Sequence, residues 1–165
     1  MRLELKLSSE KHLDELLSIR NEVDTQLSAM VEAKGQTIED VKRWTKRYSL
    51  SKSDKLYVVE LKGICIGYVQ LNSITLNPSY AKLGIVIAKK YQGKGFGKKV
   101  MELIINKAFK ELKINKIILE VLSSNFTARK LYTGLGFREV GKLIEHFNFS
   151  GKKIDVIIME KFINK

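Results

Sequence analysis

The chain has 165 residues, with 30 lysines and arginines against 18 acidic residues and a formal net charge of +12. This length fits one domain with a sizeable core, over residues 1–165. No apolar run approaches the roughly 18 residues that a membrane-spanning helix needs, and a single cysteine, Cys65, excludes an internal disulfide. Residues 1–6 alternate between charged and apolar types, which favours a strand over a signal peptide. We therefore expect a cytoplasmic protein without a membrane partner.

Hydrophobic periodicity predicts both helices and strands along the chain. Alternate leucines favour a strand at the start, whereas apolar residues three or four apart follow Thr37, where Asp40 completes a capping box. Residues 25–35 have no clear period and are expected to form the end of a helix and a loop. In chain order we expect a strand at 2–7, helices from about 10 to 21 and at 38–48, strands at 56–59, 64–71 and 80–87, a helix from about 97 to 112, a strand at 114–122, a short helix at 124–134 and a closing hairpin at 137–149 and 154–162.

A glycine-rich turn connects one of these strands to a helix. The apolar run 83–87 precedes the stretch Gln92-Gly93-Lys94-Gly95-Phe96-Gly97-Lys98. Glycines at alternate positions allow a ligand to approach the backbone, and the next helix presents unpaired N–H groups and the positive end of its dipole. Five lysines lie between Lys89 and Lys99, with no acidic residue among them. These features together predict a phosphate-binding turn.

Two familiar phosphate motifs do not fit this turn. A P-loop requires G-x-x-x-x-G-K-[ST], but its first glycine would fall on Gln92 and its hydroxyl residue on Lys99. A Rossmann fingerprint requires G-x-G-x-x-G, but its third glycine would fall on Lys98. The turn therefore belongs to neither of these nucleotide-binding classes.

The turn instead resembles the Q/R-x-x-G-x-G/A pyrophosphate loop of the GNAT superfamily, whose members transfer acyl groups from acyl-CoA to amines. A second block resembles that family's L-E-V-x-x-x-N-x-x-A-x-x-L-Y-x-x-x-G-F segment, and the two blocks together span residues 83–137. In this chain the second block contains Leu119-Glu120-Val121, Asn125, Ala128, Leu131-Tyr132 and Gly136-Phe137. The resemblance implies an α/β (α+β) fold: a mixed, mostly antiparallel seven-stranded sheet, flanked by about four helices and splayed between its fourth and fifth strands.

The resemblance also implies acetyl-CoA as co-substrate and no metal ion. The pantetheine arm would bind like an added strand to the backbone of the strand before the turn, and the turn would hold the pyrophosphate through its backbone N–H groups. Asn125 would bind the pantetheine amides or cap the short helix, and both roles remain open. The cofactor-binding residues that the resemblance implies are Ile85, Val86, Ile87, Gln92, Gly93, Lys94, Gly95, Phe96, Gly97, Lys98, Asn125 and Lys130.

Acyl transfer to an amine needs a base for the amine and an acid for the leaving thiolate. Tyr132 is the expected acid, because the resemblance places the family's acid at this position of the motif and a phenol with a pKa of about 10 is protonated at neutral pH; the alternative is a core tyrosine beneath the sheet. Many family members carry a glutamate base in an A-E-L-G stretch, but this chain has Lys82 at that place. Glu120 is the expected base instead, acting through one water, with a structural or solvated role as the alternative.

The acceptor amine is not identified by the sequence. Residues 20–50 usually form the acceptor wall in this family; Arg20, Glu22, Asp24, Arg43, Trp44 and Arg47 lie there, although the spacing of Trp44 fits a core residue equally well. The resemblance extends to acetyltransferases of ribosomal-protein N-termini, spermidine and amino-sugar nucleotides. The net charge argues against a polycationic acceptor. Expected partners are acetyl-CoA and a small-molecule or peptide amine, without nucleic acid, and a homodimer stays open. The alternative function is a catalytically silent, basic RNA- or ribosome-binding module on the same fold.

Overall fold

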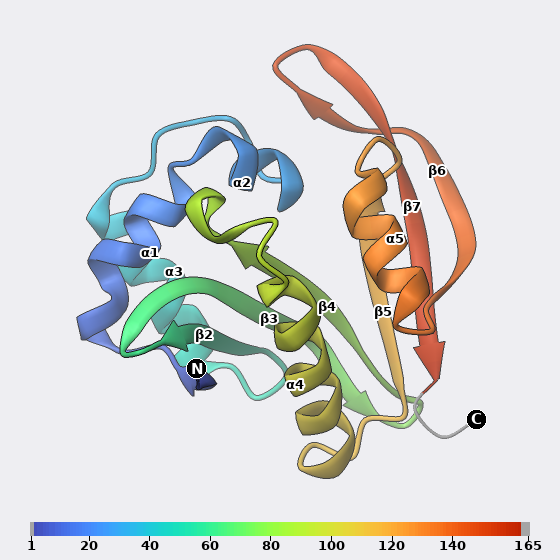
Figure 1. Cartoon of the computed structure of the whole chain (residues 1–165), viewed down its shortest axis with the longest axis horizontal. Coiled ribbons are helices and arrows are strands. Elements are labelled where there is room, and N and C mark those ends of the chain that lie inside the picture. Colours follow the sequence, from blue (N-terminus) through green and yellow to red (C-terminus); the bar gives the residue numbers. More distant parts are fainter. Residues whose placement is uncertain (1, 163–165) are drawn as a thin grey trace.

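The computed structural model describes residues 2–162, which form one seven-stranded sheet with helices on both faces (Figure 1). The strand order is β1-β2-β3-β4-β5-β7-β6. No helix in the described range is long and apolar enough to cross a membrane. The strands are β1 (Leu3–Leu7), β2 (Lys55–Leu61), β3 (Ile64–Leu76), β4 (Ser79–Ile87), β5 (Lys116–Leu122), β6 (Arg138–Phe149) and β7 (Lys152–Phe162). The α-helices are α1 (Leu13–Arg20), α2 (Val23–Ser28), α3 (Ile38–Leu50), α4 (Phe96–Lys110) and α5 (Phe126–Gly134), with short 3-10 helices η1 (Glu10–His12) and η2 (Lys89–Tyr91).

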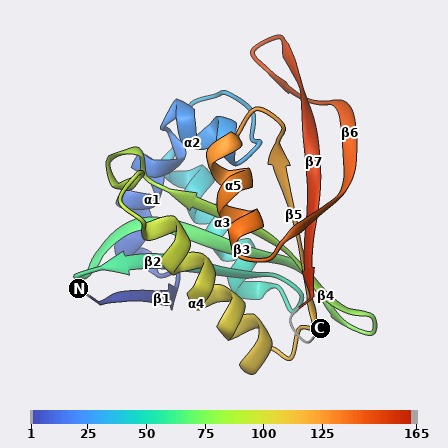
Figure 2. The same cartoon turned by 45° about the vertical axis from the view of Figure 1, so that its right-hand side comes forward.

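The sheet opens between β4 and β5. These two strands are parallel and pair only through residues 80–83 of β4 and 116–119 of β5, whereas the other neighbouring strands are antiparallel. Beyond that point β4 continues against β3 and β5 continues against β7, so that the two strands diverge (Figures 1 and 2). The expected mixed sheet, with its splay between the fourth and fifth strands, is confirmed.

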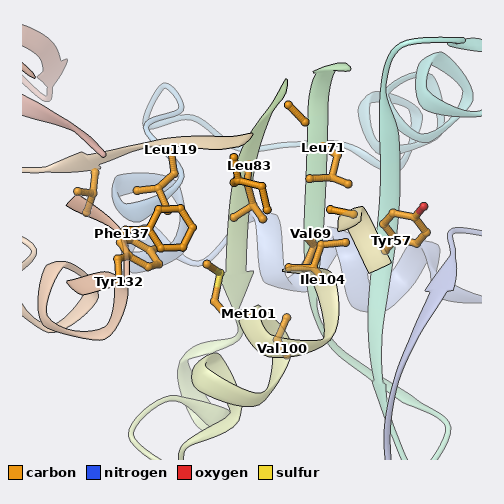
Figure 3. Close-up of a cluster of buried hydrophobic side chains, with 14 of the residues drawn as sticks. Tyr57, Val69, Leu71, Leu83, Val100, Met101, Ile104, Leu119, Tyr132 and Phe137 are labelled. Atoms are coloured by element: carbon orange, nitrogen blue, oxygen red, sulfur yellow. The ribbon is translucent and has the colours of Figure 1, made fainter. Parts of the chain in front are cut away.

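Two hydrophobic clusters attach the helices to opposite faces of the sheet. In the first cluster, α4 and α5 pack on one face, where Figure 3 shows side chains of α4 beside those of β3 and β4. In the second cluster, α1 and α3 pack on the other face. Successive side chains of a strand point to opposite faces, and β3 follows this rule. Val69 and Leu71 belong to the first cluster and Tyr68 to the second, so Gln70 and Asn72 face the side of α1 and α3.

Residues 2–162 form five α-helices where the sequence predicts four. The additional helix is α2, whose residues Val23–Ser28 overlap the stretch 25–35 that was expected to be a helix end and loop. Its buried residues are polar: Thr25 Oγ1 donates to Glu22 O at 2.8 Å, and Gln26 Nε2 donates to Lys34 O at 2.8 Å. Side-chain hydrogen bonds to the backbone stabilise this helix, and its buried residues are polar. The sequence therefore lacks the periodic apolar residues that would predict a helix here. Strand β3 also extends to Leu76, past the predicted end at residue 71.

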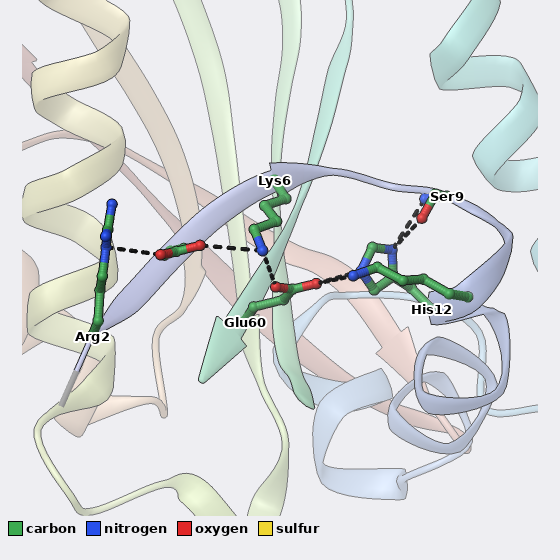
Figure 4. A network of polar contacts seen from close by, with 7 residues as sticks. Arg2, Lys6, Ser9, His12 and Glu60 are labelled. Carbon is green, nitrogen blue, oxygen red and sulfur yellow. Dashed lines mark hydrogen bonds and ion pairs between the residues drawn. The ribbon is translucent and has the colours of Figure 1, made fainter. Parts of the chain in front are cut away.

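A buried carboxylate ties β2 to the N-terminal segment. Glu60 is 2% exposed. Its Oε1 accepts from Lys11 Nζ and His12 Nε2, each at 2.8 Å, and its Oε2 accepts from Lys6 Nζ at 2.5 Å (Figure 4). The backbone N–H of Ser9 donates to His12 Nδ1 at 3.1 Å, which places the imidazole proton on Nε2, facing the carboxylate. Hydrogen bonds from Lys11, Lys6 and His12 lower the pKa of Glu60 to about 2.

We expect Glu60→Gln to destabilise the fold at neutral pH by about 1 to 3 kcal/mol, because a carboxylate that accepts charge-assisted bonds is lost. The folded-state pKa of Glu60 lies below its ordinary value of 4.5. Its stabilising effect is therefore present above about pH 4.5 and is lost as the pH falls towards about 2. The difference in free energy of unfolding between the two proteins, measured by urea denaturation at several pH values, should shrink below about pH 4.5. A difference that stays constant down to about pH 3 would contradict this account.

Candidate functional site

The divergence of β4 and β5 leaves a cleft of about 1010 Å³. Both expected catalytic residues, Tyr132 and Glu120, line it. Of the expected cofactor-binding residues, those that line the cleft are Ile85, Val86, Ile87, Gln92, Gly93, Gly95, Gly97, Lys98 and Asn125. Within the described part of the chain, Lys94, Phe96 and Lys130 do not line it. The structure thus brings most of the predicted site together around one opening in the sheet.

The glycine turn forms the N-terminal end of α4. Gly95 is the N-cap residue, with a left-handed φ of 78° that glycine adopts without strain, and no side chain caps the helix. The hydrogen bond from Lys99 N to Gly95 O, at 3.4 Å, is the first of the helix, so the N–H groups of residues 96–98 precede it and lack helical partners. Free N–H groups and the helix dipole make this turn fit an anionic diphosphate.

Gln92 supports the turn in a way that the motif does not predict. Its backbone N–H donates to Lys89 O at 3.1 Å and is therefore already engaged. Its side-chain Nε2 donates to Ile87 O at 2.8 Å. Gln92 thus fixes the turn to the end of β4, and its backbone N–H is not one of the free donors that the sequence analysis expected for the diphosphate.

The cationic and aromatic residues of the turn have separate places. Phe96 is buried and packs its ring against Tyr91, with ring centroids 6.2 Å apart. Only the backbone of Phe96 is therefore available to a ligand. Lys94 lies 5.9 Å from the Tyr91 ring centroid, outside the cleft lining, whereas Lys98 lies in it. Lys130 is exposed on α5.

The edge of β4 beside the turn can bind an extended ligand. Residues 84–87 pair with β3 on one side only, because the pairing with β5 ends at Leu83. The other side carries backbone N–H and C=O groups that face the cleft. Such an edge binds extended amide-containing chains as an added strand does, which fits the two amides of pantetheine.

Tyr132 is positioned by the C-terminal turn of α5. The helix begins at the N-cap residue Asn125, whose Oδ1 accepts from Ala128 N at 3.1 Å, so the expected capping role is confirmed. At the other end Gly136 has a φ of 86°, and Phe137 N donates to Tyr132 O at 3.0 Å. This turn brings the Phe137 ring to within 5.9 Å of the Tyr132 ring, centroid to centroid.

Tyr132 belongs to the first hydrophobic cluster and also lines the cleft. The residue is only 8% exposed, and burial raises the pKa of its hydroxyl to about 12. Burial therefore keeps the hydroxyl protonated at any physiological pH, and it also makes the phenol a weaker proton donor than a tyrosine in water. The core alternative and the catalytic role for this tyrosine are compatible.

Glu120 lies at the point where β4 and β5 part. It is exposed and follows Leu119, the last β5 residue that pairs with β4. Leu119 and Val121 point into the first cluster, so Glu120 points to the opposite face. An exposed carboxylate at this fork is within the cleft and accessible to water, which fits a base that acts through a water molecule.

The acceptor side of the cleft uses only part of the expected wall at residues 20–50: Asp24 lines it, whereas Arg20, Glu22, Arg43, Trp44 and Arg47 do not. From the first third of the chain, the lining comes from residue 24 and residues 27–30, in and after α2. Trp44 packs against the second cluster, and the Arg20 guanidinium lies 4.1 Å from its ring centroid, outside the lining. Gln70 and Asn72 also line the cleft, from β3, and are not among the residues that the sequence predicts for the site. The available signal was the alternation of Gln70 with apolar residues in the predicted strand 64–71; Asn72 continues that alternation one residue beyond its predicted end.

The sequence profile of the acetyltransferase (GNAT) domain family matches residues 2–138. A spermidine N(1)-acetyltransferase of Vibrio cholerae is 30% identical over 135 residues, which cover 79% of this chain and 78% of that protein. The crystal structure of the Vibrio cholerae spermidine N-acetyltransferase with CoA and spermine has a TM-score of 0.91 at 27% identity, covering 97% of this chain and 95% of the other. A dodecameric structure of the Vibrio cholerae enzyme in an intermediate state has a TM-score of 0.82 at 25% identity, covering 97% of this chain and 93% of the other.

Proposed function

The chain belongs to the acetyltransferase (GNAT) domain family and is an acetyl-CoA-dependent N-acetyltransferase, and from this premise we propose that it acetylates a primary amine of a polyamine such as spermidine or spermine. The observation that carries the proposal is the match along 97% of the chain to an enzyme solved with CoA and spermine. Family membership favours an enzyme over the silent RNA-binding alternative. The dodecamer of the Vibrio cholerae enzyme supports self-association, and the expected homodimer stays a prediction.

The net charge of +12 does not exclude a polycationic acceptor. Screening limits the effect of surface charges to about 10 Å in ordinary salt, so the charges at the cleft matter more than the total. The carboxylate of Glu120 lies in the cleft. Lys89, which also lines it, is engaged by the Asp24 carboxylate through its Nζ and by Glu22 Oε2 through its backbone N–H at 2.8 Å. Lys82 and Lys98 line the cleft as well, so the lining within residues 2–162 has three lysines against the two carboxylates of Asp24 and Glu120 and does not by itself favour a cationic substrate. Glu120 is the carboxylate that such a substrate could contact near the reacting atoms.

The proposed mechanism is direct attack within a ternary complex. Glu120 removes a proton from the substrate ammonium through one water molecule, and the free amine attacks the thioester carbon. A nitrogen–carbon bond forms and the carbon–sulfur bond breaks. Tyr132 gives its phenolic proton to the leaving sulfur, and the second proton that the nitrogen loses as the amide forms restores the phenol by way of solvent. The chain's own contribution is to hold the two reactants in line, with the thioester between Tyr132 and Glu120.

A thiol-release assay over a set of amines tests the substrate class. We expect spermidine and spermine to show a kcat/KM at least about 10-fold above those of N-terminal peptides, aminoglycosides and nucleotide-linked amino sugars, because a difference of about 1.4 kcal/mol in transition-state binding suffices. Mass spectrometry of the product would identify the acetylated nitrogen. Preference for a peptide N-terminus or an amino-sugar nucleotide would refute the polyamine assignment while keeping the enzyme class. If none of the amines in the set gives thiol release although acetyl-CoA is bound, both the polyamine assignment and the enzyme class are refuted.

A further inference from the structure

Three strands place two polar side chains in one row across the mouth of the cleft. Gln70 of β3 pairs with Gly84 of β4. The pairing of β4 with β5 ends at Leu83 and Leu119, so the next residues in the same register are Gly84 and Glu120. Gln70, Gly84 and Glu120 therefore occupy one row at the point where the sheet opens, and all three line the cleft.

The side chains of this row point to the same face of the sheet. The neighbours of Gln70 in β3, Val69 and Leu71, lie in the first hydrophobic cluster. The neighbours of Glu120 in β5, which are Leu119 and Val121, lie in the same cluster. Alternation along a strand then directs Gln70 and Glu120 to the opposite face, that of α1 and α3.

Gly84 leaves a gap between the two polar side chains. A Cβ atom placed on Gly84 would lie 3.5 Å from Gln70 Oε1. The Gln70 side chain therefore reaches over the glycine, with its oxygen as the nearest atom. Because residue 84 has no side chain, the space between this oxygen and β5 is open to a small polar group.

The amide orientation of Gln70 is fixed by Tyr48. Gln70 Nε2 donates to Tyr48 Oη at 2.6 Å, and Tyr48 Oη donates to Asn72 Oδ1 at 2.7 Å. A phenol has one proton, so Tyr48 accepts from Gln70 when it donates to Asn72. Tyr48 is 5% exposed and packs edge-on against Trp44, with ring centroids 5.8 Å apart. This buried hydroxyl holds the donor end of the Gln70 amide away from the gap and leaves the acceptor end facing it.

We propose that Gln70 Oε1 binds and orients the nitrogen of the acceptor amine, opposite Glu120. The inference rests on the proposed function, whose acceptor-binding residues it specifies. An N–H of the substrate donates to Gln70 Oε1, and the proton to be removed faces Glu120. The nitrogen lone pair is then directed at a thioester held along the edge of β4. A carbonyl oxygen accepts from an ammonium and, more weakly, from a neutral amine, so this contact persists while the nitrogen loses its proton. Tyr48 acts through Gln70 and is a positioning residue.

The test compares two substitutions of Gln70 that differ in one property. Gln70→Leu has a similar size and no acceptor atom, whereas Gln70→Glu keeps an oxygen at the same place. We expect Gln70→Leu to lower kcat/KM for the amine by roughly 10- to 100-fold, the loss for one hydrogen bond to a charged group. Gln70→Glu should keep the wild-type KM for the amine or lower it. The KM for acetyl-CoA should stay within about twofold of the wild-type value in both, because β4 and the turn are unchanged.

A second variant separates binding from folding. Tyr48→Phe removes one hydroxyl, leaves the Gln70 amide free to rotate, and should raise the amine KM without a change in acetyl-CoA KM. Equal kcat/KM for the amine in wild type and Gln70→Leu would overturn the inference, as would a parallel loss of acetyl-CoA affinity. If Gln70→Leu does not fold, an unchanged amine KM in Tyr48→Phe would overturn it.

The same series distinguishes failure of this inference from failure of the proposed substrate. If the wild type prefers a peptide amine to spermidine, the polyamine assignment fails. The Gln70 variants, measured with that peptide, still test whether Gln70 orients the acceptor nitrogen. If calorimetry with spermine and the other amines shows no binding to the wild-type protein saturated with CoA, both fail. Full activity of Gln70→Leu towards spermidine would support the proposed substrate class and refute only the proposed role of Gln70.

Discussion

Tyr132→Phe should lower kcat by roughly 100- to 1,000-fold, the usual contribution of a positioned acid. The substitution removes only the hydroxyl and leaves the ring that packs 5.9 Å from Phe137, centroid to centroid. Without a proton donor the sulfur must leave as a thiolate, which raises the barrier to breakdown of the tetrahedral intermediate. Burial raises the pKa of the phenol to about 12. The wild type should therefore show no alkaline decline in kcat from this residue up to about pH 10.

The measurement is steady-state thiol release, together with the dissociation constant for acetyl-CoA from calorimetry. Tyr80→Phe serves as the matched control, because Tyr80 begins the parallel pairing of β4 and lies outside the cleft lining. It should leave kcat within about twofold of the wild-type value, as expected for a surface change away from the site. Unchanged turnover in Tyr132→Phe would show that another group, or solvent, protonates the thiolate. Loss of acetyl-CoA affinity in place of turnover would assign Tyr132 to binding.

The parts of the site that the sequence predicts are those whose chemistry lies in contiguous residues. The turn at residues 92–98 and the α5 segment are local, since a glycine at an N-cap, an asparagine cap and a tyrosine two turns later need no knowledge of the tertiary fold. The capping box at Thr37 is of the same kind: Asp40 N donates to Thr37 Oγ1 at 3.2 Å, and Thr37 N donates to Asp40 Oδ2 at 2.8 Å. The residues that form each of these features lie within a few positions of one another in the sequence.

The parts that the sequence does not predict depend on partners far along the chain. Glu60 lies in an apolar strand, and the cations that make its burial tolerable, Lys6 and Lys11, are 54 and 49 residues away. Gln70 gains its orientation from Tyr48, which is 22 residues earlier, and its place opposite Glu120 from the register of three strands. Helix α2 has no apolar stripe. Hydrophobic periodicity indicates which face of an element is buried. It does not identify polar groups that are buried together with a hydrogen-bonding partner.

Gly67→Ala should be the most destabilising of the glycine-to-alanine substitutions in the strands, where an added Cβ at Gly84 or Gly141 would have no contact shorter than 3.5 Å. A Cβ atom at position 67 would lie 2.2 Å from Val86 O and 3.1 Å from Ile87 Cα. Both are backbone atoms of the neighbouring strand, so no side-chain rotation relieves the contact. The close approach arises at a bulge, because Val59 pairs with Gly67 while Glu60 pairs with Cys65, which leaves Ile66 as an extra residue in β3. To accept a methyl group, β3 and β4 must separate at the strand that borders the cleft.

We expect Gly67→Ala to cost about 3 kcal/mol or more, the upper range for overpacking a close-packed site. For a chain of this size that loss corresponds to a fall in Tm of about 10 °C, measurable by calorimetry or by circular dichroism. Gly35→Ala is the matched control, since a Cβ there would meet nothing within 4 Å, and it should change the free energy of unfolding by less than about 0.5 kcal/mol. A Gly67→Ala protein that melts with the wild type would show that β3 and β4 adjust their spacing freely. The edge of β4 would then be too compliant to hold an extended ligand in register with Gln70 and Glu120.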